Sequence, residues 1–196
     1  MTETKKALEG IRVLDVTQFL AGPYAGMTLA DMGAEVIKIE NPWQGDFTRK
    51  VYPKKNDVSM YFENVNRNKK SVTLNLKEKE DKEKFKKLAE TADVIIENNR
   101  PGVMKKLGLS YEDIKKINDK IIYASISGFG QYGPYKNRPG YDIISQAMGG
   151  AMSITGWPEN PPTRSGIALG DILGGMNATI GILSALNYRN KTGKGQ

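Results

Sequence analysis

Carboxylates, lysines, hydroxyls and backbone groups are what this sequence offers for chemistry, because its 196 residues contain no cysteine and no histidine. That composition excludes disulfides, thiolate nucleophiles, zinc sites built from Cys and His, and a Ser-His-Asp triad. The formal net charge is +7, and a basic excess favours anionic partners such as nucleic acid or a phosphate-bearing cofactor. The remaining candidates are therefore a reactive carboxylate and cations that hold an anion.

Asp171 is the acid whose surroundings best suit catalysis. It follows the small and apolar run 166–170 (GIALG) and stands at the expected start of an apolar helix. On the local pattern alone it is an ordinary helix N-cap. The two roles are compatible, because a carboxylate at a helix N-terminus meets free N–H groups and should stay ionised. An ionised carboxylate in a partly apolar pocket can act as a nucleophile.

Gly128, Gly130 and Gly133 form the string G-x-G-x-x-G after an expected strand. A dinucleotide site needs a helix to open at such a string and an acidic residue about 20 positions later. Pro134 interrupts the helix register, and the residue at the second position is Met148. The string therefore predicts a tight loop that a ligand or another stretch of backbone approaches closely.

The densest run of charge, 77–87 (KEKEDKEKFKK), alternates acids with lysines. This pattern is typical of a solvated helix face with i,i+4 ion pairs. The chain has no aromatic-basic stripe of the kind that binds nucleic acid, so we expect no nucleic-acid partner. No carboxylates pair in a metal context, and we expect no metal site.

Alternating strands and helices must position these groups. Strands are expected at 11–16, 35–39, 71–76, 93–97 and 120–125, and helices at 23–33, 78–91, 101–107, 110–118 and 141–148. Ser110 and Asp113 form a capping box for the fourth of these helices. Loops are expected at 41–56, 128–140 and 149–166. The alternation predicts an α/β fold with a Rossmann-like parallel sheet and flanking helices.

A last helix is expected from about Asp171 to Arg189, with apolar residues nearly all round it. Such a helix should be buried. Three glycines within it, Gly174, Gly175 and Gly181, would each cost about 1 kcal/mol unless another backbone packs closely against them. The given sequence stops soon afterwards, so we expect this helix to rest on a further part of the polypeptide or on a second subunit.

The first ten residues are polar and mixed in charge, without an apolar signal core. No apolar stretch of the sequence approaches the length of a membrane span. We therefore expect a cytoplasmic protein without a membrane partner.

Short motifs in a fixed order make the chain resemble the family III CoA-transferases, typified by formyl-CoA transferase and carnitine CoA-transferase. The motifs run through nearly the whole chain: 8–15 (LEGIRVLD), 21–23 (AGP), 33–40 (GAEVIKIE), 45–46 (GD), 66–71 (NRNKKS), 92–98 (ADVIIEN), 127–131 (SGFGQ), 138–142 (RPGYD), 170–171 (GD) and 192–196 (TGKGQ). The resemblance implies that residues 1–196 are the N-terminal part of the large CoA-binding Rossmann-like domain, with the small domain and the C-terminal segment absent.

The resemblance places the family's nucleophilic aspartate on Asp171. It implies an enzyme that moves CoA from an acyl-CoA donor to a small carboxylic acid through a mixed anhydride and an aspartyl-CoA thioester. Coenzyme A is then a substrate, and no cofactor is bound permanently. The route needs neither a metal nor a histidine, which suits this composition.

Positions that contact CoA also follow from the resemblance. They are Phe19, Leu20, Ala21, Leu74, Lys77, Asn98, Asn99 and Lys106. Lys77 and Lys106 would meet phosphates as point charges, with a solvated surface lysine as the alternative reading of each. Asn41 replaces a family arginine, so one contact to adenine or phosphate has no counterpart there. Asp142 matches an acidic residue that accompanies the nucleophile, or else caps a helix.

Family members are longer than this chain and form dimers of interlocked rings. The resemblance therefore implies an interlocked homodimer for the complete protein. It also places beyond Gln196 a glycine-rich loop that closes over the aspartate, so this fragment alone should lack full activity.

Two alternatives stay open. An α-methylacyl-CoA racemase shares the fold, but those enzymes use a histidine at the position of Tyr141, and this chain contains no histidine. The other alternative is a CoA-binding or scaffold fragment without catalysis.

Overall fold

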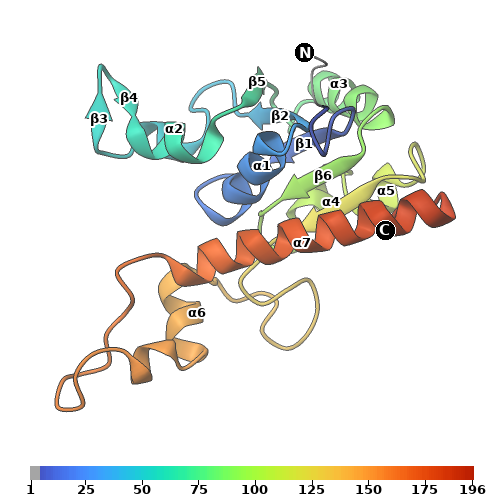
Figure 1. Ribbon diagram of the computed structural model, residues 1–196. Coiled ribbons are helices and arrows are strands. Elements are labelled where there is room, and N and C mark those ends of the chain that lie inside the picture. Colours follow the sequence, from blue (N-terminus) through green and yellow to red (C-terminus); the bar gives the residue numbers. More distant parts are fainter. Residues whose placement is uncertain (1–4) are drawn as a thin grey trace.

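The computed structural model describes residues 5–196, and its centre is a sheet of five parallel strands (Figure 1). The strands are β1 (Arg12–Val16), β2 (Glu35–Glu40), β5 (Lys69–Thr73), β6 (Val94–Glu97) and β7 (Ile122–Ser125). Their spatial order is β5-β2-β1-β6-β7, so the chain moves outward in one direction from β1 and later in the other. The predicted Rossmann-like α/β fold is confirmed.

Helices cover both faces of the sheet because successive strand residues point to opposite sides. Val13 of β1 packs in a core with α1 (Ala21–Asp31) and α7 (Leu169–Thr192). The next residue, Leu14, packs in a second core with α3 (Lys79–Glu90), α4 (Val103–Leu107) and α5 (Tyr111–Ile114). Both cores take apolar residues from the strands, which is why the strands read as nearly continuous hydrophobic runs.

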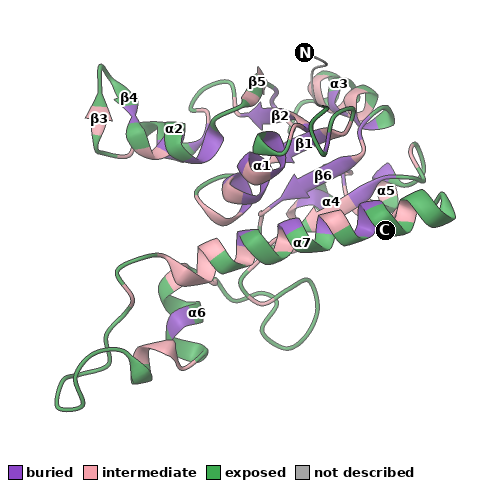
Figure 2. Ribbon diagram, in the orientation of Figure 1, coloured by how far each residue is buried: buried purple, intermediate pink, exposed green. Residues whose placement is uncertain are grey.

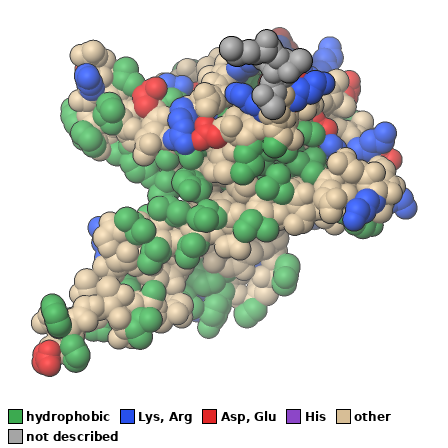
Figure 3. Space-filling model, viewed as in Figure 1, with side chains coloured by type: hydrophobic (Ala, Val, Ile, Leu, Met, Phe, Trp, Pro, Cys, Tyr) green, Lys and Arg blue, Asp and Glu red, His purple; other side chains and the backbone are tan. Residues whose placement is uncertain are grey.

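Two groups of short elements project from this body (Figure 1). One contains the 3-10 turn η1 (Phe47–Lys50), the hairpin strands β3 (Lys54–Lys55) and β4 (Val58–Ser59), and α2 (Met60–Asn66). The other contains α6 (Asp142–Met148) and the 3-10 turn η2 (Ala151–Ile154). The second group is mostly exposed (Figure 2), and hydrophobic side chains lie on its surface among other residues (Figure 3). Ile143 and Ile154 are among its exposed apolar residues.

Several predicted boundaries differ from the structure. The third predicted strand, 71–76, is β5 at Lys69–Thr73, so it begins two residues earlier and its last predicted residues lie outside it. The predicted loop 41–56 contains η1 and β3. The segment that follows it was assigned no element, yet forms β4 and α2. The capping box of Ser110 and Asp113 is present, but its helix α5 ends at Ile114. The charged run does form a solvated helix, with Lys84 2.9 Å from Glu80.

The prediction that α7 is buried all round is wrong for this chain. Gly175, Ile182 and Leu186 are among its buried residues, whereas Leu173 and Ile180 are at least half exposed. Figure 2 shows the exposed side as a mostly green and pink stripe. The expectation that no apolar stretch is long enough to cross a membrane is wrong for α7, which passes that test by length and composition alone. A core helix passes the same test, and this one packs one face against α1. The expected covering by further polypeptide or a second subunit stays a prediction.

Close backbone packing explains one of the three glycines in α7. A Cβ atom at Gly175 would lie 2.5 Å from the carbonyl oxygen of Ala21, so no larger residue fits there. The expected close approach is therefore confirmed at Gly175. Gly174 and Gly181 have no atom within 4 Å of such a Cβ among the described residues, so the structure gives no packing reason for them.

Candidate active site

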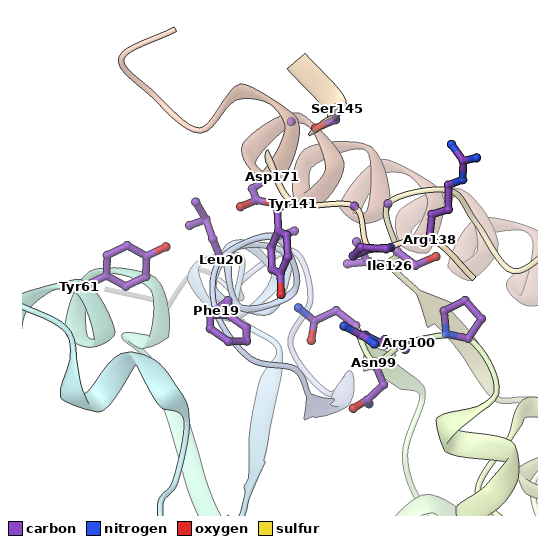
Figure 4. Close-up of a pocket in the computed structure, with 18 residues that line it drawn as sticks. Phe19, Leu20, Tyr61, Asn99, Arg100, Ile126, Arg138, Tyr141, Ser145 and Asp171 are labelled. Atoms are coloured by element: carbon purple, nitrogen blue, oxygen red, sulfur yellow. The ribbon is translucent and has the colours of Figure 1, made fainter. Parts of the chain in front are cut away.

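A cavity of about 430 Å³ lies beyond the carboxyl ends of β1, β6 and β7. In open parallel sheets ligands bind at this edge, next to the strand from which the chain leaves in both directions, and the volume suits a small ligand. Segments far apart in the sequence supply its walls (Figure 4): Phe19, Leu20, Ala21, Tyr61, Asn98, Asn99, Arg100, Pro101, Ile126, Ser127, Gly128, Arg138, Pro139, Gly140, Tyr141, Ser145, Gly170 and Asp171.

Asp171 is the one acidic residue among the described residues that line this cavity. It lies in the first turn of α7, but the N-cap is Ala168, so the predicted N-cap role is wrong. Burial raises the pKa of Asp171 above the usual value, and the nearby charge of Asp142 raises it further. These effects oppose the helix N-terminus, which favours the ionised form. The result is a more basic carboxylate than the sequence analysis expected.

Asp142 supports the turn that carries Asp171. Its Oδ1 accepts a hydrogen bond of 2.8 Å from the backbone N–H of Gly170, one of the N–H groups that the start of a helix leaves free. Asp142 itself lies in the first turn of α6, whose N-cap is Tyr141. It therefore caps the neighbouring helix α7 rather than its own.

Phe19 forms a wall of the cavity in an unusual backbone conformation, with φ of +68°. That left-handed region is uncommon for a bulky residue and costs about 1–3 kcal/mol. Buried polar contacts hold the loop in place: Lys38 Nζ donates to the carbonyl oxygen of Thr17 (2.8 Å), and the N–H of Phe19 donates to Asp46 Oδ1 (3.5 Å). Phe47 adds an aromatic contact, with its ring centroid 5.4 Å from that of Phe19.

The cations and anions beneath this loop are buried as two pairs. Lys38 Nζ lies 2.9 Å from Asp46 Oδ2, and both side chains are at most 1% exposed. Asp46 Oδ2 accepts no hydrogen bond from the described residues, so this is a charge contact. Lys69 Nζ lies 2.7 Å from Asp15 Oδ2 and is likewise almost inaccessible. Opposite charges next to each other offset the large cost of burying each one.

Asn98 joins two walls of the cavity. Its Oδ1 accepts from the backbone N–H of Gln18 (2.9 Å), and its Nδ2 donates to the carbonyl oxygen of the same residue (2.6 Å). The side chain thus fixes the loop after β1 to the end of β6. Asn99 follows it in the cavity wall and donates its backbone N–H to Glu97 Oε2 (2.8 Å).

The other predicted CoA contacts lie outside this cavity. Leu74 is 7% exposed and packs in the second core. Lys77 and Lys106 are exposed lysines. Asn41, which replaces a family arginine, also lies outside it. The structure thus gathers Phe19, Leu20, Ala21, Asn98 and Asn99 with Asp171, and it places Leu74, Lys77 and Lys106 elsewhere. Contact with CoA stays a prediction for all eight residues.

Several cavity residues were missed by the sequence reading. Tyr61 comes from α2. Burial raises the pKa of its hydroxyl, and the negative charges of Asp171 and Asp46 raise it further. The sequence does mark the start of α2, because Ser59 is a residue type that often caps helices. Its hydroxyl accepts a hydrogen bond of 3.2 Å from the backbone N–H of Phe62. Arg100 and Arg138 also line the cavity, and the Arg138 guanidinium lies over the Tyr135 ring, 4.1 Å from its centroid. Arg138 begins the family motif 138–142, whereas nothing local in the sequence marks Arg100.

The glycine string forms a loop, as predicted. A Cβ atom at Gly128 would lie 2.3 Å from the Cα of Gly140, and the reverse distance is the same. The two ends of the loop therefore meet backbone to backbone at the cavity wall. Gly130 and Gly133 have φ of +77° and +89°, which suits glycine. No helix opens at this string, so the dinucleotide alternative is wrong.

Taken together, a parallel Rossmann-like sheet with a half-buried aspartate at the edge of a cavity defines an α/β protein with a candidate nucleophile. The sequence model of the family described as CoA-transferase family III matches residues 8–196 of this chain. This chain therefore belongs to CoA-transferase family III.

Individual relatives agree with this assignment. The chain is 50% identical to acetyl-CoA:oxalate CoA-transferase of Acetobacter aceti, a match that covers 100% of the chain and 52% of that protein. It is 49% identical to succinyl-CoA:glutarate CoA-transferase of Mus musculus, over 98% of the chain and 44% of the relative. A crystal structure of a CaiB/BaiF family protein from Brucella suis matches with a TM-score of 0.94 and 44% identity, over 98% of the chain and 52% of the other. The chain thus spans about half the length of the relatives it matches.

Proposed function

We propose that this chain carries the nucleophile of a CoA-transferase, which moves CoA from an acyl-CoA donor to a small carboxylic acid through an aspartyl-CoA thioester on Asp171. The observation that carries the proposal is the half-buried Asp171 at a cavity that Arg100 and Arg138 also line. Burial and the charge of Asp142 raise the pKa of this aspartate. A basic and partly desolvated carboxylate is a better nucleophile than an exposed one. Arginine is well suited to hold a carboxylate or a phosphate.

The bonds of this reaction balance without any proton transfer. The carboxylate of Asp171 attacks the thioester carbonyl of the donor, the C–S bond breaks, and CoA leaves as a thiolate while a mixed anhydride forms. The thiolate then attacks the Asp171 carbonyl carbon and releases the donor acid as a carboxylate. The acceptor carboxylate attacks the resulting thioester, and the thiolate returns to the acceptor acyl group and frees Asp171. Covalent catalysis divides one difficult exchange into easier steps.

The relatives narrow the class of acid. Their names give oxalate and glutarate as acids on which those proteins act, and both are small dicarboxylates. We infer a small dicarboxylic acid as acceptor or donor acid here, because a second carboxylate could pair with an arginine of the cavity lining. The mixed-anhydride route itself rests on the resemblance and on the position of Asp171.

The test uses the complete polypeptide with acyl-CoA donors and a panel of mono- and dicarboxylic acids. Transfer of CoA to the acceptor should fall by at least a thousandfold in Asp171→Ala, with retention of the fold checked by circular dichroism. Borohydride or hydroxylamine trapping after incubation with donor should label Asp171 in the wild type. Full transfer activity in Asp171→Ala would rule out the proposed mechanism. Proton exchange at the α-carbon without CoA exchange would favour a racemase, and CoA binding without turnover would favour a scaffold.

A further inference from the structure

Gln146 on α6 is buried where the pattern of its helix predicts the opposite. It is 3% exposed, while its neighbours Ile143, Ile144 and Met148 are 46%, 36% and 55% exposed. A short surface helix ordinarily buries its isoleucines and exposes its amides. Burying an amide also costs free energy unless its hydrogen bonds are made. A buried glutamine among exposed apolar residues therefore indicates a specific set of hydrogen bonds.

Two of the three hydrogen bonds of Gln146 connect α6 to the approach to Asp171, and the third stays within α6, at Asp142. Its Nε2 donates to Asp142 Oδ2 (2.7 Å) and to the carbonyl oxygen of Ile167 (3.3 Å). Its Oε1 accepts from the backbone N–H of Ser165 (2.8 Å). The side chain thus ties the irregular segment 165–167 to the start of α6.

Asp142 completes the connection. Its Oδ1 accepts from the N–H of Gly170, the residue before Asp171, and its Oδ2 accepts from Gln146. The polarity of the network follows from these partners: Ser165 donates to the Gln146 oxygen, so the amide nitrogen has to face Asp142. Both oxygens of Asp142 then act as acceptors. A glutamate at position 146 has the same shape but could not donate to Asp142.

We propose that Gln146 is a positioning residue, which holds Asp142 and the segment 165–170 so that the first turn of α7 presents Asp171 to the cavity. The inference rests on the proposed function, because it assigns Gln146 a role in the reaction of Asp171. Asp171 changes from carboxylate to anhydride to thioester and back, and each step needs the same atom in an attacking geometry. A misplacement of about 1 Å can cost about a hundredfold in rate.

Two variants of the complete polypeptide test this role through kcat and KM for the acyl-CoA. Gln146→Glu should lower kcat by about 10- to 100-fold, with KM changed less than about threefold, because Phe19 and Asn98 are held by other contacts. Asp142→Asn/Gln146→Glu reverses the polarity of the bond, since the new amide at position 142 would donate and the new carboxylate at position 146 would accept. The double variant should therefore be at least threefold faster than Gln146→Glu. Gln44→Glu, at an exposed glutamine, is the matched control and should keep the wild-type kcat.

Hydrogen–deuterium exchange provides a readout that does not depend on turnover. Backbone amides of 165–171 should exchange faster in Gln146→Glu and return toward the wild-type rate in the double variant. Gln146→Glu with kcat within twofold of wild type, or a double variant no faster than Gln146→Glu, overturns the inference while leaving the proposed function intact. If the wild type transfers no CoA, the proposed function fails, and unchanged exchange of 165–171 in Gln146→Glu would then overturn the anchoring as well.

Discussion

Replacing Lys38 by methionine should destabilise the protein strongly, because Lys38 is a buried cation with a buried partner. Its side chain is 1% exposed, lies 2.9 Å from Asp46 Oδ2 and donates to the carbonyl oxygen of Thr17. Methionine has a similar length but no charge and no N–H group. The substitution would leave the Asp46 carboxylate and the Thr17 carbonyl without their partner in a site that water cannot reach.

The size of the effect follows from the burial of both ions. Removing one partner of a buried pair costs about 3–5 kcal/mol, mostly because the other charge stays buried without compensation. At about 1.4 kcal/mol per factor of ten, this lowers the ratio of folded to unfolded protein by two to four orders of magnitude. Lys38→Met/Asp46→Asn should lose less than Lys38→Met alone, since asparagine leaves no unpaired charge.

Equilibrium unfolding of the complete polypeptide in urea measures this loss, with the m-value as a check that the denatured state is unchanged. Lys84→Met is the matched control, because Lys84 is also ion-paired, with Glu80 and Asp81, but its side chain is 53% exposed. Exposed pairs often contribute nothing measurable, so this variant should keep the wild-type midpoint. Equal midpoints for Lys38→Met and Lys84→Met would refute the claim that the buried pair stabilises the fold.

Two further predictions concern the turn that carries Asp171. Asp142→Asn removes a negative charge that helps to raise the Asp171 pKa; ionised Asp171 should then persist to lower pH, and the acid limb of the kcat/KM profile should move down in pH. An unmoved limb would contradict this assignment. Gly170→Ala would place a Cβ atom 2.0 Å from Ser145 Oγ and should lower kcat about tenfold or more. Ser145→Gly should restore activity in that background, and failure to do so would contradict the packing argument.

The parallel sheet could be predicted because its strands are apolar on both sides. The residues 93–97 and 11–16 are rich in Val, Ile and Leu. Successive residues of β6 and of β1 pack alternately into the first and the second core. Helix starts were also visible where a side chain caps them, as Ser110 shows. These signals are local, so a single sequence contains them.

The polar part of the fold could not be predicted in this way. Lys38 and Lys69 lie within or at the start of strands, and a buried lysine looks like a surface lysine until its partner is known. The partner of Lys69 is Asp15, 54 positions away. The predicted strand 71–76 begins two residues later than β5, because β5 starts with Lys69 and Lys70 and the apolar pattern begins after them.

In the candidate site, too, residues with a local signal could be predicted and residues from separate segments could not. Asp171 was identified from its small-residue approach and from the family motifs, and the cavity contains it together with five of the eight predicted CoA contacts. Tyr61, Arg100 and Arg138 reach the cavity from separate segments, so only the folded chain brings them together. Gln146 was missed because the exposed isoleucines around it predict the wrong buried face for α6.

The contact between α7 and α1 determines how far Asp171 lies from the wall made by Phe19, Leu20 and Ala21. Gly175 follows Asp171 by one helical turn, and its missing side chain lets α7 approach the carbonyl oxygen of Ala21. A methyl group there would meet backbone, which cannot move aside as a flexible side chain would, so α7 would have to shift away from α1. Because Ala21 lines the cavity and Asp171 lies on the same helix as Gly175, that shift would separate the nucleophile from the loop expected to hold CoA. The width of the site thus depends on a glycine outside it, whereas Asp142 anchors the residue before Asp171 through the hydrogen bond from the N–H of Gly170.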